Sequence, residues 1–496
     1  MNAVLLTHPW SIWTIIVPLA AAVLAFLVPR RAPLAGIITA LSVALFVAAT
    51  AYRIFLAGPH IQLLGGWQAP LGITLRVDGP ALIMLLTSGL VGLTVSFYAA
   101  GYFTAADRQE RRQQHYFWPL WLLLWAGCNA LFLSGDLFNL YVTLELVTLS
   151  SIALAALNGS SAALDGAMRY LMAGLLGSLS YLLGVALIYG AYGTVDLTLL
   201  GQTVRADGLS RAALALMTAG LLLKTALFPL HFWLPPAHAS APPPVSALLS
   251  GLVVKAPLLI LFRLWFEVFP DTATAGMAHL LGILGCGAII WGSLMALRQQ
   301  RLKLLVAYST VAQIGYFFLL FPLARGEAAA TAWVGVFLLV LAHGCSKASM
   351  FLVCGTITRL AGHDRLTGLA GAGGTLGARL LVFALAAVTL VGMPPSSGFI
   401  AKWLLINAAI VTGQWWYLAT IALGTLLASG YVIRVLSLAF TESQSPPLPI
   451  APRILRWPPL ALAVVALLLG LAAFHPAVLT LAGAPVSGII LLEMVP

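Results

Sequence analysis

The sequence predicts an all-α integral membrane protein with about fourteen transmembrane helices. Hydrophobic residues fill 61% of the 496 positions and charged residues only 8%, which is too few to cover an ordinary water-soluble surface. Apolar runs of roughly 20 residues recur along the chain, as helices that cross a bilayer core about 30 Å thick require. Short segments rich in Pro, Gly or charge separate these runs.

The expected spans follow one another with short connections, and each is predicted from its hydropathy and from the polar or helix-breaking residues beside it. In the first half they cover 4–28, 33–57, 78–102, 115–133, 136–157, 163–191 and 210–233. In the second half they cover 244–266, 274–296, 303–322, 331–358, 378–411, 415–440 and 457–474.

Basic residues gather in alternate connections. The richer set comprises Arg30, Arg31, Arg108, Arg111, Arg112, Arg298, Arg301, Lys303, Arg359, Arg365, Arg453 and Arg456. The opposite set is mainly Arg53, Arg76, Arg205, Arg211 and Arg325. The positive-inside rule places the richer set in the cytoplasm, so both termini are expected outside it. The formal charge of +11 then indicates topology and contact with anionic lipid, and no nucleic acid is expected as a partner.

The cysteines argue against a metal or redox centre. All four lie inside expected helices and form no C-x-x-C pair, so we expect no iron–sulfur or zinc site and no cofactor: Cys128, Cys286, Cys345 and Cys354. No G-x-G-x-x-G follows a strand, and the histidines lack a paired haem-like arrangement. A redox catalyst in its own right is therefore disfavoured.

A few ionisable residues lie deep inside the apolar spans. They are Glu145, Lys224, Lys255, His343, Lys347 and Lys402. Each charge costs about 2.5 to 3.5 kcal/mol at mid-membrane, so four lysines and one glutamate cost of order 10 kcal/mol. Structural ion pairs or snorkelling side chains are one explanation, but one carboxylate cannot pair four lysines. The pattern favours a relay of titratable groups along a hydrated path.

Prolines interrupt two of these spans. Pro229 follows Lys224 by five residues, and Pro394 and Pro395 precede Lys402. Proline removes a helix hydrogen bond, and exposed backbone at this depth is tolerated only beside protein or a hydrated cavity. A simple kink is the alternative at each place taken alone. A break beside a buried lysine in both the seventh and the twelfth span favours a functional role.

The two breaks lie five helices apart, which predicts two five-helix units of opposite orientation, as in many transporters. The expected organisation has four parts, namely helices 1–3 in 1–103, a first inverted repeat of helices 4–8 in 104–267, a second of helices 9–13 in 268–440, and helix 14 with a tail in 441–496.

Five ordered stretches carry a family resemblance. They are GDLFNLYVTLELVTLSS, KTALFPLHFWLPPAHASAPPPVSALLSGLVVK, RLKLLVAYSTVAQIGY, HGCSKASMF and GMPPSSGFIAKW. Together they resemble the antiporter-like subunits shared by respiratory complex I, membrane-bound hydrogenases and Mrp cation/proton antiporters. The resemblance implies fourteen helices in two inverted repeats, with broken seventh and twelfth helices and a central hydrophilic axis.

The resemblance also implies roles for single residues. Glu145, Lys224, Lys255, His343, Lys347 and Lys402 match the axis that moves protons, with the first two expected to face each other, while His231 and His238 match histidines of a proton entry on the cytoplasmic side. The asparagine in DLFNLYV and Lys255 look like the D-type Mrp subunit. Two positions depart from the family, because Arg301 stands where many relatives have an acid and Pro236 replaces a common aspartate.

The expected function is therefore proton translocation within a multisubunit Na⁺/H⁺ or K⁺/H⁺ antiporter of the cell inner (plasma) membrane, with other membrane subunits as partners. The alternative is a proton-pumping subunit of a complex I-like or hydrogenase-type redox complex. A solute transporter that works alone is a third possibility, but nothing in the sequence offers a substrate pocket beyond the lysine axis.

Overall fold

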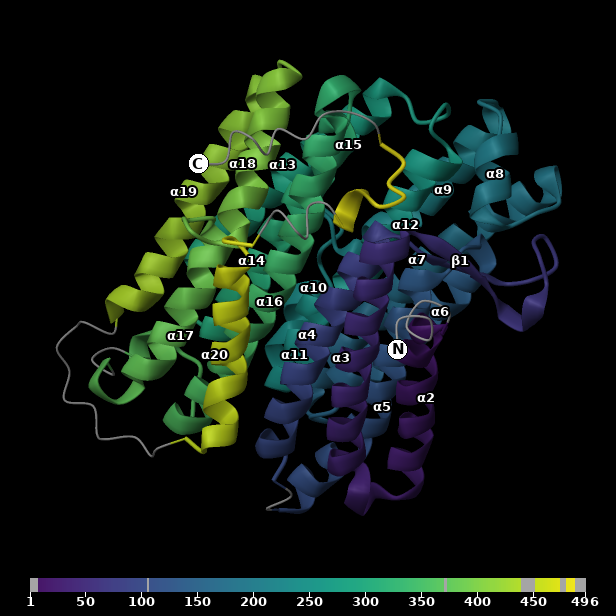
Figure 1. The fold of residues 1–496 in the computed structure, drawn as a ribbon. Coiled ribbons are helices and arrows are strands. Elements are labelled where there is room, and N and C mark those ends of the chain that lie inside the picture. Colours follow the sequence, from purple (N-terminus) through teal and green to yellow (C-terminus); the bar gives the residue numbers. More distant parts are fainter. Residues whose placement is uncertain (1–7, 105–106, 370–372, 439–450, 473–478, 487–496) are drawn as a thin grey trace.

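The computed structural model describes residues 8–104, 107–369, 373–438, 451–472 and 479–486, and almost all regular structure within them is helical (Figure 1). Among these residues, eleven helices are long and apolar enough to cross a membrane. Two shorter apolar helices, Leu376–Val391 and Ser397–Val411, lie near the C-terminal end. The prediction of an all-α integral membrane protein is confirmed, whereas the count of about fourteen spans stays a prediction.

The first six expected spans each correspond to one helix. These are α2 (Trp10–Leu27), α3 (Ala32–Ala57), α4 (Gly79–Tyr102), α5 (Arg108–Leu133), α6 (Leu137–Ala155) and α7 (Ser161–Tyr192). A short antiparallel hairpin, β1 (His60–Leu63) and β2 (Thr74–Val77), joins α3 to α4 and pairs His60 with Val77. The hairpin occupies a connection that the hydropathy pattern left without structure.

The middle of the chain is more broken than the sequence predicts. Its elements are α8 (Leu197–Thr203), α9 (Gly208–Thr225), α10 (Leu234–Ser240), α11 (Pro243–Gly251), the 3₁₀ turn η3 (Val253–Lys255), α12 (Ala256–Arg263) and the π-helical turn η4 (Leu264–Val268). The helix of the expected seventh span, 210–233, ends at Thr225, and the chain around Pro229 is not helical until α10 begins at Leu234, so the break that the proline predicted is confirmed. The expected eighth span, 244–266, is divided into α11, η3, α12 and η4, which its apolar pattern did not predict.

The C-terminal half contains α13 (Ala275–Arg298), α14 (Leu302–Phe318), α15 (Leu320–Leu323), α16 (Ala329–Ala361), α17 (Gly373–Val391), α18 (Ser397–Val411), α19 (Trp415–Ser437) and α20 (Arg453–Leu468). The expected twelfth span is divided into α17 and α18, so the second predicted break is confirmed as well. The predicted boundary between 440 and 441 lies outside the described residues, and so do residues 4–7 of the first expected span and 473–474 of the last.

Aspartates begin several helices and so account for much of the small number of acids. Asp78, Asp107, Asp136, Asp196 and Asp207 each accept a hydrogen bond from a backbone N–H in the first turn that follows. These N–H groups have no partner inside the helix, and a carboxylate at this end is also attracted by the positive end of the helix dipole. Few acids are consequently left to pair with the buried lysines.

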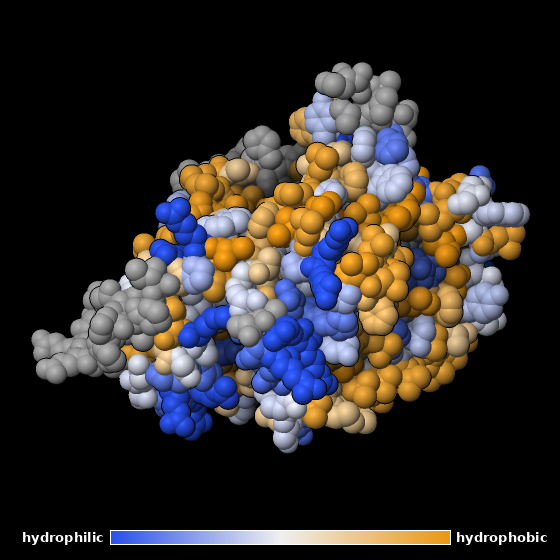
Figure 2. Space-filling model, turned by 90° about the horizontal axis from the view of Figure 1, so that it is seen from below, coloured by the Kyte–Doolittle hydropathy of each residue, from blue (hydrophilic) through white to orange (hydrophobic). Residues whose placement is uncertain are grey.

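The helices differ in depth within the bundle. The most apolar windows of Pro243–Val268 and Gly326–Ala361 are fully buried, whereas those of α2 and α19 are 33% buried. Accordingly α16 runs through the middle, with α2, α3 and α5 on one side and α18 and α19 on the other (Figure 1). Figure 2 shows the bundle from below, where hydrophilic residues gather and hydrophobic residues surround them. Lys255 at the end of η3 and Lys347 in α16 are accordingly buried among other helices.

Candidate functional site

Glu145 and Lys224 form an ion pair inside the N-terminal half of the bundle. The ammonium Nζ of Lys224 in α9 lies 3.0 Å from Oε1 of Glu145 in α6 and donates a second hydrogen bond of 2.7 Å to Oγ1 of Thr148. Ser178 of α7 donates to the same carboxylate oxygen. The lysine side chain is 4% exposed and the glutamate 18%. The expectation that these two residues face each other is confirmed.

Close helix packing and the helix break position Lys224. Helix α9 ends at Thr225, the residue after Lys224. Ala226 then adopts the left-handed region with φ of 57°, so the chain leaves the helix there. A Cβ on Gly220 would lie 2.2 Å from the carbonyl oxygen of Gly177, so α7 and α9 approach each other only because both positions lack side chains. Lys224 is therefore positioned at the C-terminal end of α9, next to Glu145 of α6.

Lys255 lies at the break between α11 and α12. Its Nζ donates to the carbonyl oxygens of Ser250 (2.9 Å) and Gly251 (2.7 Å) and contacts Nδ1 of His343 at 3.0 Å. Leu252 departs from helical geometry, and Pro257 has no N–H to continue the ladder. The ammonium therefore takes the place of the missing helix donors. Pro257 and Gly251 are the signals from which this break was predictable.

His343 and Lys347 lie four residues apart on α16, so they share one helix face. Lys347 Nζ donates to the carbonyl oxygen of Val306 at 2.8 Å and also contacts Oγ of Ser309, both in α14. The Nε2 atom of His343 is buried and has no hydrogen-bond partner among the described residues, while Nδ1 contacts Lys255. His343 thus has one ring nitrogen in use and one available on the opposite edge.

Lys402 lies in the second turn of α18, and its ammonium group reaches back to the break between α17 and α18. Its Nζ donates to the carbonyl oxygens of Val391 (2.9 Å) and Leu390 (3.3 Å), which end α17, and lies 4.4 Å from the ring centre of Tyr316. Gly392 has φ of 85°, and a Cβ there would meet the lysine's Cδ at 2.8 Å. Only glycine allows both the turn and the approach of the lysine.

The lysines share one way of offsetting their burial. Lys255 and Lys402 bind backbone carbonyls at the C-terminal ends of α11 and α17, and Lys347 binds a carbonyl of α14. Carbonyls at a helix C-terminus have no partner inside the helix and carry partial negative charge. The broken helices therefore supply acceptors for Lys255 and Lys402, and a carbonyl within α14 supplies one for Lys347, where the sequence offers one deep carboxylate.

The two candidate entry histidines lie in different surroundings. His238 in α10 is fully buried, its ring stacks on Phe351 at 4.7 Å, and neither ring nitrogen has a hydrogen-bond partner among the described residues. The charges of Lys303 and Lys347 both act on it. His231 lies in the break after α9, where its ring stacks on Phe228. The charges on Lys303 and Lys347 thus connect His238 with the lysine series, whereas the contact found for His231 is with Phe228.

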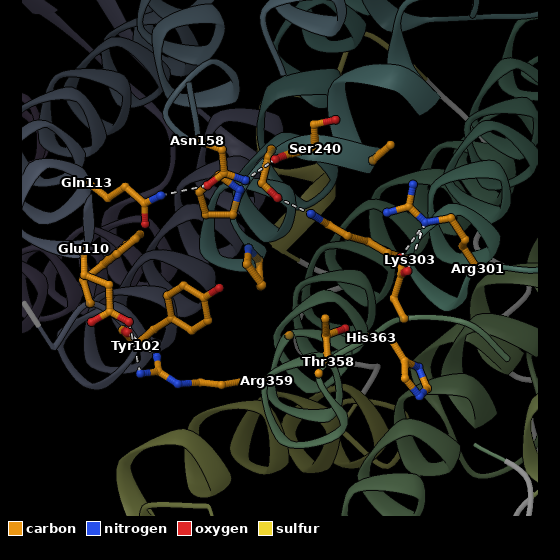
Figure 3. A pocket seen from close by; sticks show the side chains of 18 residues that line it. Tyr102, Glu110, Gln113, Asn158, Ser240, Arg301, Lys303, Thr358, Arg359 and His363 are labelled. Carbon is orange, nitrogen blue, oxygen red and sulfur yellow. Dashed lines mark hydrogen bonds and ion pairs between the residues drawn. The ribbon is translucent and has the colours of Figure 1, made fainter. Parts of the chain in front are cut away.

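A polar cavity of about 420 Å³ opens at the C-terminal end of α10, where Ala239 and Ser240 line it among the arginine-rich connections (Figure 3). Lys303 lines it and donates to the carbonyl oxygen of Ala241. Arg301 binds both carboxylate oxygens of Asp364 at 3.0 and 2.9 Å, so this departure from the family pattern has an acidic partner. Lys303 was expected in a basic connection at the membrane surface, but its side chain is buried at the start of α14.

A second buried charge group was missed entirely. Arg263 in α12 is 2% exposed and donates to both oxygens of Asp78 at 2.9 Å and to Glu267 at 2.8 Å. Arg76 of β2 also contacts Glu267. The hairpin, the start of α4 and the end of the eighth span are therefore joined by charge. The four-residue spacing of Arg263 and Glu267 was the available sequence signal.

Pro236, the other departure from the family pattern, lies in the first turn of α10. A backbone N–H in a first turn has no helical acceptor, so proline costs little at this position. Among the described residues, no group of three or more His, Cys, Asp or Glu side chains lies close enough to hold a metal ion. The four cysteines are free thiols.

Comparison with known proteins connects this geometry with a family. Residues 134–428 match the model of the NADH:quinone oxidoreductase/Mrp antiporter transmembrane family. That range contains every lysine of the series described above and the glutamate that pairs with the first of them.

Two curated relatives carry different names. The NADH-quinone oxidoreductase subunit N of Desulforudis audaxviator is 34% identical over 396 residues, which cover 78% of this chain and 77% of the relative. The D-type subunit of the Na(+)/H(+) antiporter of Alkalihalophilus pseudofirmus is 30% identical over 414 residues, which cover 82% of this chain and 81% of the relative. The fold is similar to a chain of the Mrp complex from Dietzia sp. DQ12-45-1b, with a TM-score of 0.85, 26% identity, and 96% and 98% of the two chains covered.

Proposed function

The chain belongs to the NADH:quinone oxidoreductase/Mrp antiporter transmembrane family, and from this premise we propose that it is the proton-translocating subunit of a multisubunit cation/proton antiporter in the cell inner (plasma) membrane. The cation is Na⁺ or K⁺, and the partners are the other membrane subunits of the complex. The supporting similarities are to the D-type subunit of an Na(+)/H(+) antiporter and to a chain of an Mrp complex.

One observation carries the proposal: the deep lysines form a series through the middle of the bundle, and each has a polar partner at hydrogen-bond distance. Glu145 pairs with Lys224, His343 contacts Lys255, and Lys347 and Lys402 bind backbone carbonyls. A lysine that is already held by partners which accept its protons can take up and release a proton without leaving its place.

The contacts support a transfer path at the centre of the series. When Nδ1 of His343 accepts a proton from Lys255, the imidazole releases one from Nε2, which has no hydrogen-bond partner among the described residues, and the same two atoms carry a proton in the reverse sense. Lys347 follows one helical turn later on the same face. His343 is thus proposed as a two-sided carrier between Lys255 and Lys347.

On the cytoplasmic side, the cavity around Lys303 supports a proton entry. We propose that protons pass from this cavity to His238, whose ring nitrogens have no hydrogen-bond partner in the part of the chain that the structure describes and on which the charges of Lys303 and Lys347 act. His231 is proposed as a second entry only from the family resemblance. Pro229, Pro394 and Pro395 are proposed to keep the two breaks open, and the parts 104–267 and 268–440 are proposed as the inverted repeats.

The second candidate function is a proton-pumping subunit of a redox complex, which the similarity to a NADH-quinone oxidoreductase subunit N favours. Both candidates use the same series of lysines. They differ in what drives the flux, because an antiporter responds to a cation gradient without any electron donor.

The complete complex in proteoliposomes tests the proposal. An imposed Na⁺ or K⁺ gradient is expected to drive proton movement, measured with a pH-sensitive dye. Lys255→Ala is expected to assemble, since it removes a buried charge, and to lose most of this flux. The matched control is Arg211→Ala at the exposed start of α9. Near-normal flux in Lys255→Ala rejects the lysine series, and flux that requires an electron donor selects the redox alternative.

A further inference from the structure

One face of α14 connects the two lysines of the C-terminal half. Ser309, Gln313 and Tyr316 are spaced by four and three residues, so they lie along a single stripe of the helix. Ser309 contacts the ammonium of Lys347, and the ring of Tyr316 lies against that of Lys402. Gln313 is between them, is 1% exposed, and has no role in the relay described so far.

The amide nitrogen of Gln313 shares an acceptor with Lys402. Its Nε2 donates to the carbonyl oxygen of Leu390 at 3.3 Å, and Lys402 Nζ donates to the same oxygen at 3.3 Å. Leu390 is the penultimate residue of α17, where the helix break leaves its carbonyl without a helical donor. Gln313 therefore helps to fix the carbonyl that holds Lys402.

The amide oxygen of Gln313, in contrast to the nitrogen, lacks a hydrogen-bond donor among the described residues. Oε1 is buried and accepts no hydrogen bond among the described residues. The hydroxyl of Tyr431 in α19 interacts with the side chains of Ser309 and Gln313, but it is also buried and makes no well-aligned hydrogen bond among the described residues. Buried polar atoms are nearly always satisfied by protein or by ordered water, so two such atoms between two lysines mark a binding place for water.

We infer that Gln313 is the positioning residue for proton transfer between Lys347 and Lys402: its nitrogen holds the Leu390 carbonyl, and its oxygen orients water that links Tyr431 and Ser309 to Lys402. This inference rests on the proposed function. A glutamine amide neither gains nor loses a proton at ordinary pH, so Gln313 orders the path and carries no charge along it.

The proton balance of the step is simple. The ammonium of Lys347 gives one proton to the water beside Ser309, and that water chain gives one proton to the neutral amine of Lys402. The result is a neutral Lys347 and an ammonium at Lys402, with the water, the Tyr431 hydroxyl and the Gln313 amide unchanged. No bond other than N–H and O–H bonds forms or breaks.

The test compares Gln313→Met, which keeps the size and removes both hydrogen-bonding groups, with Gln313→Glu, which keeps an acceptor. The control is Gln414→Met, because Gln414 is also buried and also donates to a backbone carbonyl, that of Pro322, but lies away from the lysines. Proton flux and its pH profile are measured for the intact complex in proteoliposomes, after matched assembly has been verified by size-exclusion chromatography. Lys402→Ala is included as a reference.

Gln313→Met is expected to lose at least tenfold in flux, while Gln414→Met stays near the wild type. Gln313→Glu is expected to recover part of the flux with its pH profile moved upward, because a carboxylate beside Lys402 favours the ammonium form. A merely structural role predicts no such movement of the profile. Wild-type flux and profile in Gln313→Met, with Lys402→Ala inactive, overturns the inference and leaves the proposed function standing. Normal flux in Lys402→Ala instead overturns the proposed function.

Discussion

Breaking the pair of Glu145 and Lys224 offers the sharpest test of how the relay is built. Two unit charges 3.0 Å apart attract by about 5 kcal/mol at an effective dielectric of 20. Since 18% of the glutamate side chain is exposed, solvent screens part of this, and about 3 to 5 kcal/mol is expected to remain, the range found when one partner of a buried pair is removed. This energy corresponds to a change of roughly a hundredfold to several thousandfold in the proton-binding constant of the lysine.

Glu145→Gln keeps the shape of the side chain and leaves the ammonium of Lys224 without its anion. Lys224→Met keeps most of the aliphatic chain and leaves the carboxylate with only the hydroxyl of Ser178. Each single variant is expected to lose most proton flux and to unfold at lower temperature. The double variant removes both charges, so it is expected to be no less active than either single variant and more stable than the sum of their losses predicts.

The assays are dye-monitored proton flux in proteoliposomes and thermal unfolding in detergent, with all variants in the assembled complex. Asp165→Asn is the control, because it breaks an ion pair on α7 in which both side chains are more than half exposed, and such pairs contribute at most about 1 kcal/mol. Stability losses that simply add in the double variant, or normal flux in Glu145→Gln, refute the pairing mechanism.

Three further outcomes are expected. With the native cysteines replaced by serine, Arg111→Cys and Asp207→Cys are expected to react with an impermeant thiol reagent from opposite sides of the membrane, since the three membrane-spanning helices α5, α6 and α7 lie between them; reaction from the same side contradicts the topology. Arg263→Met is expected to destabilise the protein by about 3 to 5 kcal/mol because Asp78 and Glu267 lose their buried cation, and a loss below 1 kcal/mol in detergent unfolding argues against the network. Burial, together with the neighbouring Asp196, raises the pKa of Asp136 against the hydrogen bond from Asn139, so the folded state binds more protons than the unfolded state and stability from this group falls as pH rises above about 4. Asp136→Asn, which still caps α6, is therefore expected to unfold at a higher temperature than the wild type at pH 7 and at the same temperature below pH 4, and an unchanged difference across this range excludes the effect.

Hydropathy and helix-breaking residues made most of the fold predictable. A bilayer accepts only segments whose backbone bonds are satisfied within the helix, so apolar length specifies helices without any knowledge of their neighbours. The prolines at 229, 394 and 395 specified two breaks for an equally local reason, the missing N–H. Counting residues from the ends of each apolar run also predicted which ionisable side chains lie deep in the membrane, namely Glu145, Lys224, Lys255, Lys347 and Lys402.

The break at Lys255 and the burial of Lys303 and Arg263 were not predicted. Lys303 and Arg263 lie within a turn or two of a helix end, where a local measure cannot separate a snorkelling cation from a buried one. Their burial depends on what packs over the end. For Arg263 the cover is Asp78 at the start of α4, which is 185 residues away in the chain.

The partners of the lysines mark the limit of the sequence. The sequence by itself determined that several ammonium groups lie deep in the membrane and that one carboxylate is too few for them. Only the tertiary structure decided that backbone carbonyls, at broken helix ends for Lys255 and Lys402 and within α14 for Lys347, supply the missing acceptors, because every residue carries a carbonyl and none is distinguishable in sequence. Which carbonyls become available depends on where helices end and which helices touch: Lys402 meets Leu390 because α18 folds back against α17, and Lys347 meets Val306 because α16 packs on α14.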